Sequence, residues 1–171
     1  MSYNLKKEKQ NAIPLRKEFR TFEDLDAYQE AREFRKKMYA VTRRLPDFEK
    51  YDLGSQIRRA AVSLTNNIAE GHGRYHFADQ VRFFLGSRGS LQELVDDLNV
   101  CADENYLEPE KIEALKGEAW RVLGLINGYL RYLRDRQADG GSVVREGRVN
   151  SPEDDEAWVW LTEALSAAGP I

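Results

Sequence analysis

The residues of this sequence that could hold a metal ion are His72, His76 and the nearby Glu70. Zinc and iron accept imidazole and carboxylate ligands, and the two histidines stand four residues apart. Gly71 and Gly73, however, interrupt the helix that would place both imidazoles on one face. We therefore expect no metal site in this chain.

Nucleophilic and cofactor chemistry have equally little support. Cys101 falls on the apolar side of its predicted helix and lacks an obvious histidine partner. The chain contains neither a P-loop nor a dinucleotide-binding fingerprint. An enzymatic interpretation would need a pocket lined by Ser63, Asn67, Glu70 and Arg74, with a strongly shifted pKa at Glu70. We expect instead a protein that is not an enzyme, with no catalytic residue and no cofactor.

The predicted second helix carries an unusual polar face. Its members are Gln56, Arg58, Arg59, Ser63, Asn66, Asn67 and Glu70. Ser63, Asn67 and Glu70 fall at helical spacing and share one side. Asparagine is a poor helix former and serine an indifferent one, so helix stability alone does not explain these choices. Two interpretations stay open: the polar groups satisfy one another between helices or subunits, or they form a pocket or a nucleic-acid contact surface.

Five arginines cluster in sequence around the second and third predicted helices: Arg58, Arg59, Arg74, Arg82 and Arg88. Residues 75–77 are aromatic neighbours on which bases could stack. The net charge of −3 argues against strong nonspecific binding through bulk charge. We therefore predict that nucleic acid is contacted by particular arginines, namely Arg58, Arg59, Arg74 and Arg88.

The apolar pattern predicts helices as the elements that position these residues. The first helix begins near Thr21, which forms a capping-box pair with Asp24, and it ends before Pro46. The second helix ends at Gly71 and Gly73, where we expect the chain to turn through a left-handed conformation.

The fourth predicted helix has the most regular pattern and opens at Pro109. Its apolar residues alternate steps of three and four: Ile112, Leu115, Ala119, Val122, Ile126, Tyr129 and Leu133. This heptad seam is typical of antiparallel helix packing. With a third helix over about residues 77–103, it predicts an all-α fold, an antiparallel up-down-up-down four-helix bundle over residues 19–137.

Glycines recur inside the third and fourth predicted helices, in the run GSRGS at residues 86–90 and at Gly117, Gly124 and Gly128. A glycine in a helix interior costs about 1 kcal/mol relative to alanine. Close approach of another helix would offset that cost, so we favour close helix packing. The floor of a pocket is the alternative interpretation.

The composition suits one domain with additional tails. The chain has 171 residues, of which 42% are hydrophobic, enough to bury a core. Residues 1–18 form a basic N-terminal arm of net charge +3, residues 19–137 carry −1, and residues 138–171 form a linker and acidic tail of −5. The single cysteine excludes an internal disulfide. No apolar run suits a signal peptide or a membrane span, so we expect a cytoplasmic protein without a membrane partner.

The acidic tail contains a possible short helix from about Pro152 to Ala168, which carries Trp158 and Trp160. Large apolar groups on an otherwise charged helix mark contact sites. The helix either docks on its own bundle or a neighbouring subunit, or binds a separate partner.

Three runs of the sequence carry a family resemblance: FRTFEDLDAYQEA, YDLGSQIRRAAVSLTNNIAEGHGR over residues 51–74, and FFLGSRGSLQELVDDL. They resemble the bacterial four-helix-bundle family, also called the 23S ribosomal RNA intervening-sequence protein family. The resemblance covers about residues 19–136 in order, and the second run is its most specific part. Its motif positions are Gln56, Arg58, Arg59, Ser63, Asn67, Glu70, Gly71, Gly73, Arg74, Gly89, Ser90 and Glu93.

The resemblance implies a compact antiparallel bundle that assembles as a homopentamer, without an established enzymatic activity. It also implies a relation to the accessory variability determinant of diversity-generating retroelements, which binds a reverse transcriptase and structured RNA. That branch is strongly basic, whereas this chain is acidic. We expect a polar face or subunit interface formed by these motif residues: Gln56, Ser63, Asn67, Glu70, Ser90 and Glu93.

The sequence thus predicts a non-enzymatic, oligomeric bundle that acts as an adaptor or scaffold. Its expected partners are further copies of itself and structured RNA or a ribonucleoprotein protein such as a reverse transcriptase. The alternative is a protein–protein interaction module that docks a partner through the acidic tail with Trp158 and Trp160.

Overall fold

The computed structural model describes residues 21–139, and all regular structure in this range is helical. Its elements are η1 (Phe22–Asp24), α1 (Asp26–Thr42), η2 (Asp47–Lys50), α2 (Leu53–His72), α3 (Phe77–Asp103) and α4 (Pro109–Asp139). The predicted arm over residues 1–18 and the acidic tail with Trp158 and Trp160 lie outside the described residues.

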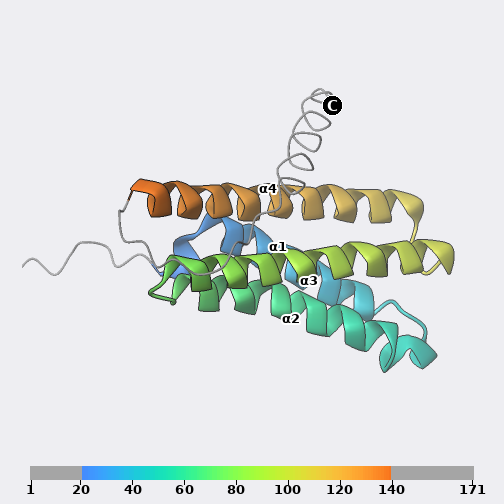
Figure 1. Ribbon diagram of the computed structural model, residues 1–171. Coiled ribbons are helices and arrows are strands. Elements are labelled where there is room, and N and C mark those ends of the chain that lie inside the picture. Colours follow the sequence, from blue (N-terminus) through green and yellow to red (C-terminus); the bar gives the residue numbers. More distant parts are fainter. Residues whose placement is uncertain (1–20, 140–171) are drawn as a thin grey trace, which may run out of the picture. The chain divides into compact units, whose positions relative to one another are not determined.

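The four α-helices lie side by side, and short connections join them (Figure 1). Each helix packs against the next one in the chain, and α1 also packs against α4. These consecutive contacts are consistent with an up-down bundle. Among the described helices, none is long and apolar enough to cross a membrane.

The predicted capping box at the start of the bundle is confirmed, but it caps a short turn. The Asp24 carboxylate accepts a hydrogen bond from the backbone N–H of Thr21 at 2.9 Å, and the Thr21 hydroxyl accepts one from Glu23 N–H at 3.2 Å. These bonds close the 3₁₀ turn η1, and α1 begins only at Asp26. The first α-helix therefore starts later than the sequence pattern predicts.

The predicted left-handed turn at the end of α2 is wrong. Gly73 has a φ of −77°, which any residue adopts, and Gly71 still belongs to α2. A Cβ at Gly71 would lie 2.9 Å from Cδ2 of Phe84 and 3.0 Å from Cβ of Phe83. Glycine is required at position 71 because α3 approaches the backbone of α2, not because of the backbone conformation.

The core lies between the four helices. The largest fully buried side chains are Phe34, Met38, Ile57, Leu64, Ile68, Phe84, Leu91, Leu94, Leu98, Leu115, Ile126 and Leu133. The heptad seam of α4 is buried as predicted except at Tyr129, which is half-buried and stacks on Phe84 with the ring centroids 4.4 Å apart. The seam therefore determines which side of α4 faces the bundle.

Close packing explains only part of the mid-helix glycines. A Cβ at Gly86 would lie 3.1 Å from Oδ1 of Asn67, so α2 and α3 do approach each other there. At Gly89, Gly117, Gly124 and Gly128, no atom of a described neighbour would lie within 4 Å of an added Cβ. For these four positions, packing within the described bundle is the wrong explanation.

Candidate functional site

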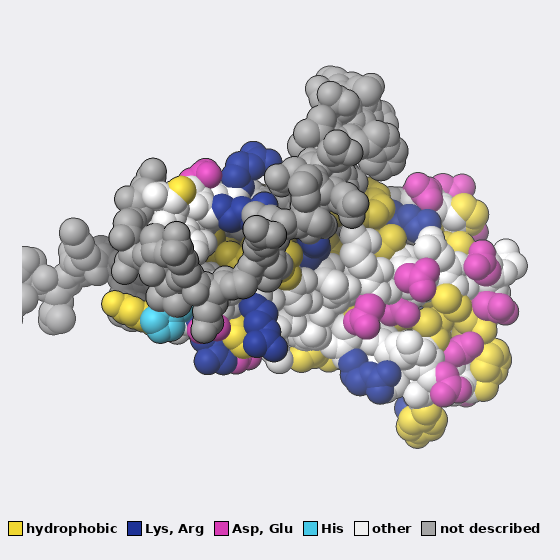
Figure 2. All heavy atoms as spheres, viewed as in Figure 1, with side chains coloured by type: hydrophobic (Ala, Val, Ile, Leu, Met, Phe, Trp, Pro, Cys, Tyr) yellow, Lys and Arg dark blue, Asp and Glu magenta, His cyan; other side chains and the backbone are white. Residues whose placement is uncertain are grey.

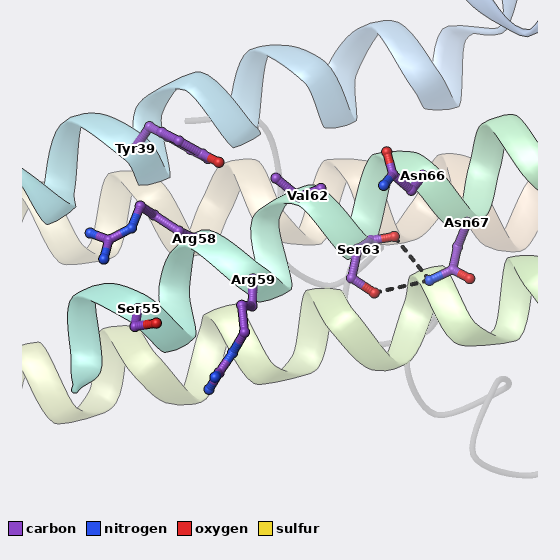
Figure 3. A pocket seen from close by; sticks show the side chains of 8 residues that line it. All are labelled: Tyr39, Ser55, Arg58, Arg59, Val62, Ser63, Asn66 and Asn67. Atoms are coloured by element: carbon purple, nitrogen blue, oxygen red, sulfur yellow. Dashed lines mark hydrogen bonds between the residues drawn. The ribbon is translucent and has the colours of Figure 1, made fainter. Parts of the chain in front are cut away.

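An open hollow of about 560 Å³ runs along α2 beside α1. We call it the arginine hollow. Its lining residues, drawn in Figure 3, are Tyr39 from α1 and Ser55, Arg58, Arg59, Val62, Ser63, Asn66 and Asn67 from α2. Apart from Val62, all of these side chains carry hydrogen-bonding groups. The hollow gathers two guanidinium groups with hydroxyl and amide groups on one surface.

The two arginines of the hollow differ in their surroundings. Arg58 donates a hydrogen bond from Nη2 to the backbone carbonyl of Lys50 at 2.8 Å, which ties its guanidinium to the end of η2. Arg59 extends from α2 toward α3 (Figure 3) and makes no hydrogen bond or ion pair with another described residue. The hydrogen bond to Lys50 therefore fixes the guanidinium group of Arg58, whereas the side chain of Arg59 can turn toward a ligand.

Part of the polar face joins α2 to α3. Asn67 Nδ2 donates to the backbone carbonyl of Ser63 at 2.9 Å and lies 3.1 Å from Ser63 Oγ (Figure 3). On α3, Ser90 Oγ donates to Ser63 Oγ at 2.8 Å and lies 3.1 Å from the carbonyl of Gly86. Ser63 thus lines the arginine hollow, and its hydroxyl also forms the hydrogen bond that joins α2 to α3.

Glu70 and Arg74 lie at the other end of α2. They form an ion pair, and the Arg74 guanidinium lies over the ring of Phe83 at 4.7 Å from its centroid. The helical rise places His72, the last residue of α2, about 20 Å along the axis from Arg59, and Arg74 follows it in the chain, so these two arginines do not share a site. Arg88 lies partly exposed on α3. Of the four predicted arginines, the structure brings Arg58 and Arg59 together in the hollow and places Arg74 elsewhere.

A second and smaller hollow, of about 150 Å³, lies between α2 and α3. We call it the acidic hollow. It is lined by Gln56, Arg59 and Ala60 from α2 and by Glu93, Asp96 and Asp97 from α3. Arg59 belongs to the walls of both hollows. The predicted residues Gln56 and Glu93 thus face the acidic hollow and not the arginine hollow.

Sequence reasoning missed Asp97, the most buried acid of the acidic hollow. Only 8% of the surface of Asp97 is exposed to solvent. Burial is the main cause that raises the pKa of its carboxyl to about 6, and the charges of Glu93 and Asp96 add to the effect. Asp97 follows buried Leu94 by three residues and precedes buried Cys101 by four. A charged residue in an apolar register was the signal in the sequence.

The candidate histidines lie at the junction of α2 and α3, and Cys101 lies within α3. His72 is the last residue of α2, and His76 directly precedes α3. Over residues 21–139, no group of three or more His, Cys, Asp or Glu side chains is placed to hold a metal ion. Cys101 is buried, and burial raises the pKa of its thiol to about 11, so the thiol stays protonated at neutral pH.

The helices that form the two hollows also match a known protein family. A family model for the 23S rRNA-intervening sequence protein matches residues 23–128, more than half of the chain. The match includes all of α1, α2 and α3 and therefore both hollows. No curated protein matches the chain. The chain belongs to the 23S rRNA-intervening sequence protein family.

Proposed function

We propose that this protein is a non-enzymatic adaptor that assembles from several copies of the bundle and binds structured RNA through the arginine hollow. The main observation in favour of RNA binding is that Arg58 and Arg59 lie in one open hollow with four small polar side chains. Proteins position nucleic acid mainly through phosphate and sugar contacts from arginine, serine and asparagine side chains. Tyr39 adds a ring at the edge of this surface for an unpaired base.

The exposure of the hollow fits a long ligand better than a small metabolite. Pockets for small molecules enclose most of their ligand, whereas the arginine hollow is open along α2. RNA is recognised largely through its shape, its phosphates and its hydroxyl groups, and an open surface with dispersed donors suits this mode. No carboxyl, imidazole, amino or thiol group of a described residue lines this hollow, so Tyr39 is its one lining candidate for general acid–base chemistry.

Self-assembly is supported by the outer face of α4. Gly117, Gly124 and Gly128 are spaced by seven and four residues, so they form one strip, and all three are exposed. The strip lies opposite the buried seam of α4, with exposed Trp120 and Tyr132 beside it. A smooth strip flanked by aromatic rings is suited to close approach by a helix from another copy.

Assembly would compensate for the low charge of the chain. Two arginines per bundle give weak phosphate binding, and the net charge of −3 adds no long-range attraction. Several copies on one particle would present the hollow repeatedly, and linked weak contacts add through effective concentration. The homopentamer implied by the family resemblance would present five such hollows.

The direct test is size-exclusion chromatography with light scattering on the full chain, with absorbance recorded at 260 and 280 nm. A particle of several subunits with excess absorbance at 260 nm, removed by ribonuclease, is the expected result. A monomer that carries no nucleic acid would contradict both parts of the proposal. An assembly that remains free of nucleic acid after incubation with cellular RNA would contradict the RNA part alone.

A further inference from the structure

The acidic hollow carries an uncompensated negative charge. Its lining holds three carboxyl groups and a single guanidinium group. Figure 2 shows Asp and Glu side chains gathered toward the end of the bundle where α1 connects to α2 and α3 connects to α4. Among the described residues, none of the three carboxylates forms an ion pair with Arg59, although all four side chains line the same hollow.

Asp97 is the group in this hollow that has a buried oxygen without a hydrogen-bond partner among the described residues. The residue is 92% shielded from solvent, the complement of its 8% exposure, and its Oδ2 atom is buried without any hydrogen bond among the described residues. A buried carboxylate oxygen is stable only when a donor replaces the water that it has lost. Neither Gln56 nor Arg59 supplies that donor, although both line the hollow. A donor from outside the described residues would therefore find an open acceptor on Asp97 in this hollow.

We propose that the acidic hollow binds an alkylammonium group, with Asp97 as its main partner and with Glu93, Asp96 and Gln56 around it. An ammonium head is a compact charge with three N–H donors, and carboxylate and amide oxygens accept such donors. A hollow of about 150 Å³ admits this head more readily than a broad planar ligand. Metal ions are a poorer match, since residues 21–139 hold no suitably placed group of three acidic, histidine or cysteine ligands.

The ammonium group can come from two sources, a free aliphatic amine or a lysine side chain on a second copy of the chain. Both sources use the same contact with Asp97. Ammonium binding at Asp97 and RNA binding at the arginine hollow are tested with different variants and different ligands. Arg59 would turn out of the acidic hollow when the ammonium enters, since two cations in one small hollow repel each other.

The test is isothermal titration calorimetry of the full chain with 1,4-butanediamine at pH 7.5 and constant ionic strength. We expect saturable binding by the wild type and at least tenfold weaker binding by Asp97→Asn, which keeps the shape of the side chain and removes its charge. Glu113→Gln is the matched control, because Glu113 is an exposed carboxylate on α4 outside the hollow. It should change the affinity less than twofold. Tetramethylammonium carries the same charge without N–H donors and should not bind.

Light scattering on the same samples distinguishes the two sources. If the particle of Asp97→Asn has the same mass as that of the wild type, the ligand is a free amine. If Asp97→Asn forms a smaller particle, and the diamine also makes the wild-type particle smaller, the ligand is a lysine of a second copy. Equal binding by wild type and Asp97→Asn, or equal binding of tetramethylammonium, would overturn the proposal. It would also be overturned if only Arg59→Gln bound the diamine, because Arg59 would then fill the hollow itself.

Discussion

Gly71 of α2 lies directly against the ring of Phe84 on α3. A Cβ at position 71 would approach Cδ2 of that ring to 2.9 Å, closer than real Cβ contacts. Phe84 is fully buried and stacks on Tyr129 of α4, so its ring has no free side to move into. This contact determines how closely α2 and α3 pack, and those two helices carry both hollows.

Gly71→Ala should therefore destabilise the fold, although alanine favours helices. We expect a loss of about 1–3 kcal/mol of unfolding free energy, because overpacking forces the Phe84 ring or the α2 backbone to shift. Gly89→Ala is the matched control: it lies in α3 with open space around it and should gain up to about 1 kcal/mol. Urea unfolding of both variants measures the difference. A stabilised Gly71→Ala would show that the helices are not in contact there.

Asp97→Asn should change how stability depends on pH. The folded state raises the pKa of Asp97 from 3.8 to about 6, so it binds this proton more tightly than the unfolded chain does. The resulting stability is fully present below about pH 4 and is lost as the pH rises through 6. The charges of Glu93 and Asp96 on α3 act on Asp97, and Arg59 of α2 lines the same hollow.

The asparagine variant lacks this titration and should be the more stable protein above pH 7, by up to about 3 kcal/mol in the absence of amines. Near pH 4 the two proteins should unfold at similar urea concentrations. The measurement is a series of urea unfolding curves between pH 4 and 8. Parallel profiles for the two proteins would show that Asp97 keeps an ordinary pKa in the fold.

Gly124→Leu should weaken self-assembly without unfolding the bundle. Gly124 is exposed at the centre of the strip on α4, and a leucine there has room within the described bundle but would obstruct a close-packed neighbour. Light scattering should record a smaller particle. Gly89→Leu makes the same change on α3, and its particle should keep the wild-type mass. Dissociation of both variants alike, or of neither, would contradict an interface on the α4 strip.

The fold was predictable from the sequence because the signals are local. The capping box at Thr21, the first-turn proline at position 109 and the heptad seam of α4 each act within a few residues, and α3 has the predicted bounds. The role of Gly71 was not predictable in this way. Its requirement arises from the Phe84 ring, thirteen residues away on another helix, and nothing in the local pattern distinguishes it from a helix-ending glycine.

The candidate site was predictable only in part. Arg58 and Arg59 were identified by their type, and the structure adds that both line one hollow. The grouping of Arg74 with them followed from sequence proximity, but the length of α2 separates it and Glu70 pairs with it. The partners of Glu93 depend on the register between α2 and α3, which helical periodicity alone does not define.

Removal of residues 140–171 should separate the two functional hypotheses. The truncation leaves α4 intact to Asp139 and removes the acidic tail with Trp158 and Trp160. If RNA binds the arginine hollow, its affinity should be retained or should rise, because the tail contributes negative charge. A pull-down and an RNA titration with the same truncated chain compare the outcomes. The protein–protein interaction module would be favoured if the full chain does not bind RNA and the truncated chain loses a protein partner that the full chain binds.

The most direct test of RNA binding by the arginine hollow is the affinity of Arg58→Ala/Arg59→Ala for a labelled RNA stem–loop, measured across a range of salt concentrations. We expect at least tenfold weaker binding and a shallower dependence on salt, because each lost phosphate contact releases about one counterion fewer. Arg134→Ala/Arg136→Ala removes the same charge from the end of α4 and should leave both quantities close to the wild type. An unchanged affinity and salt dependence in Arg58→Ala/Arg59→Ala would contradict RNA binding at this hollow.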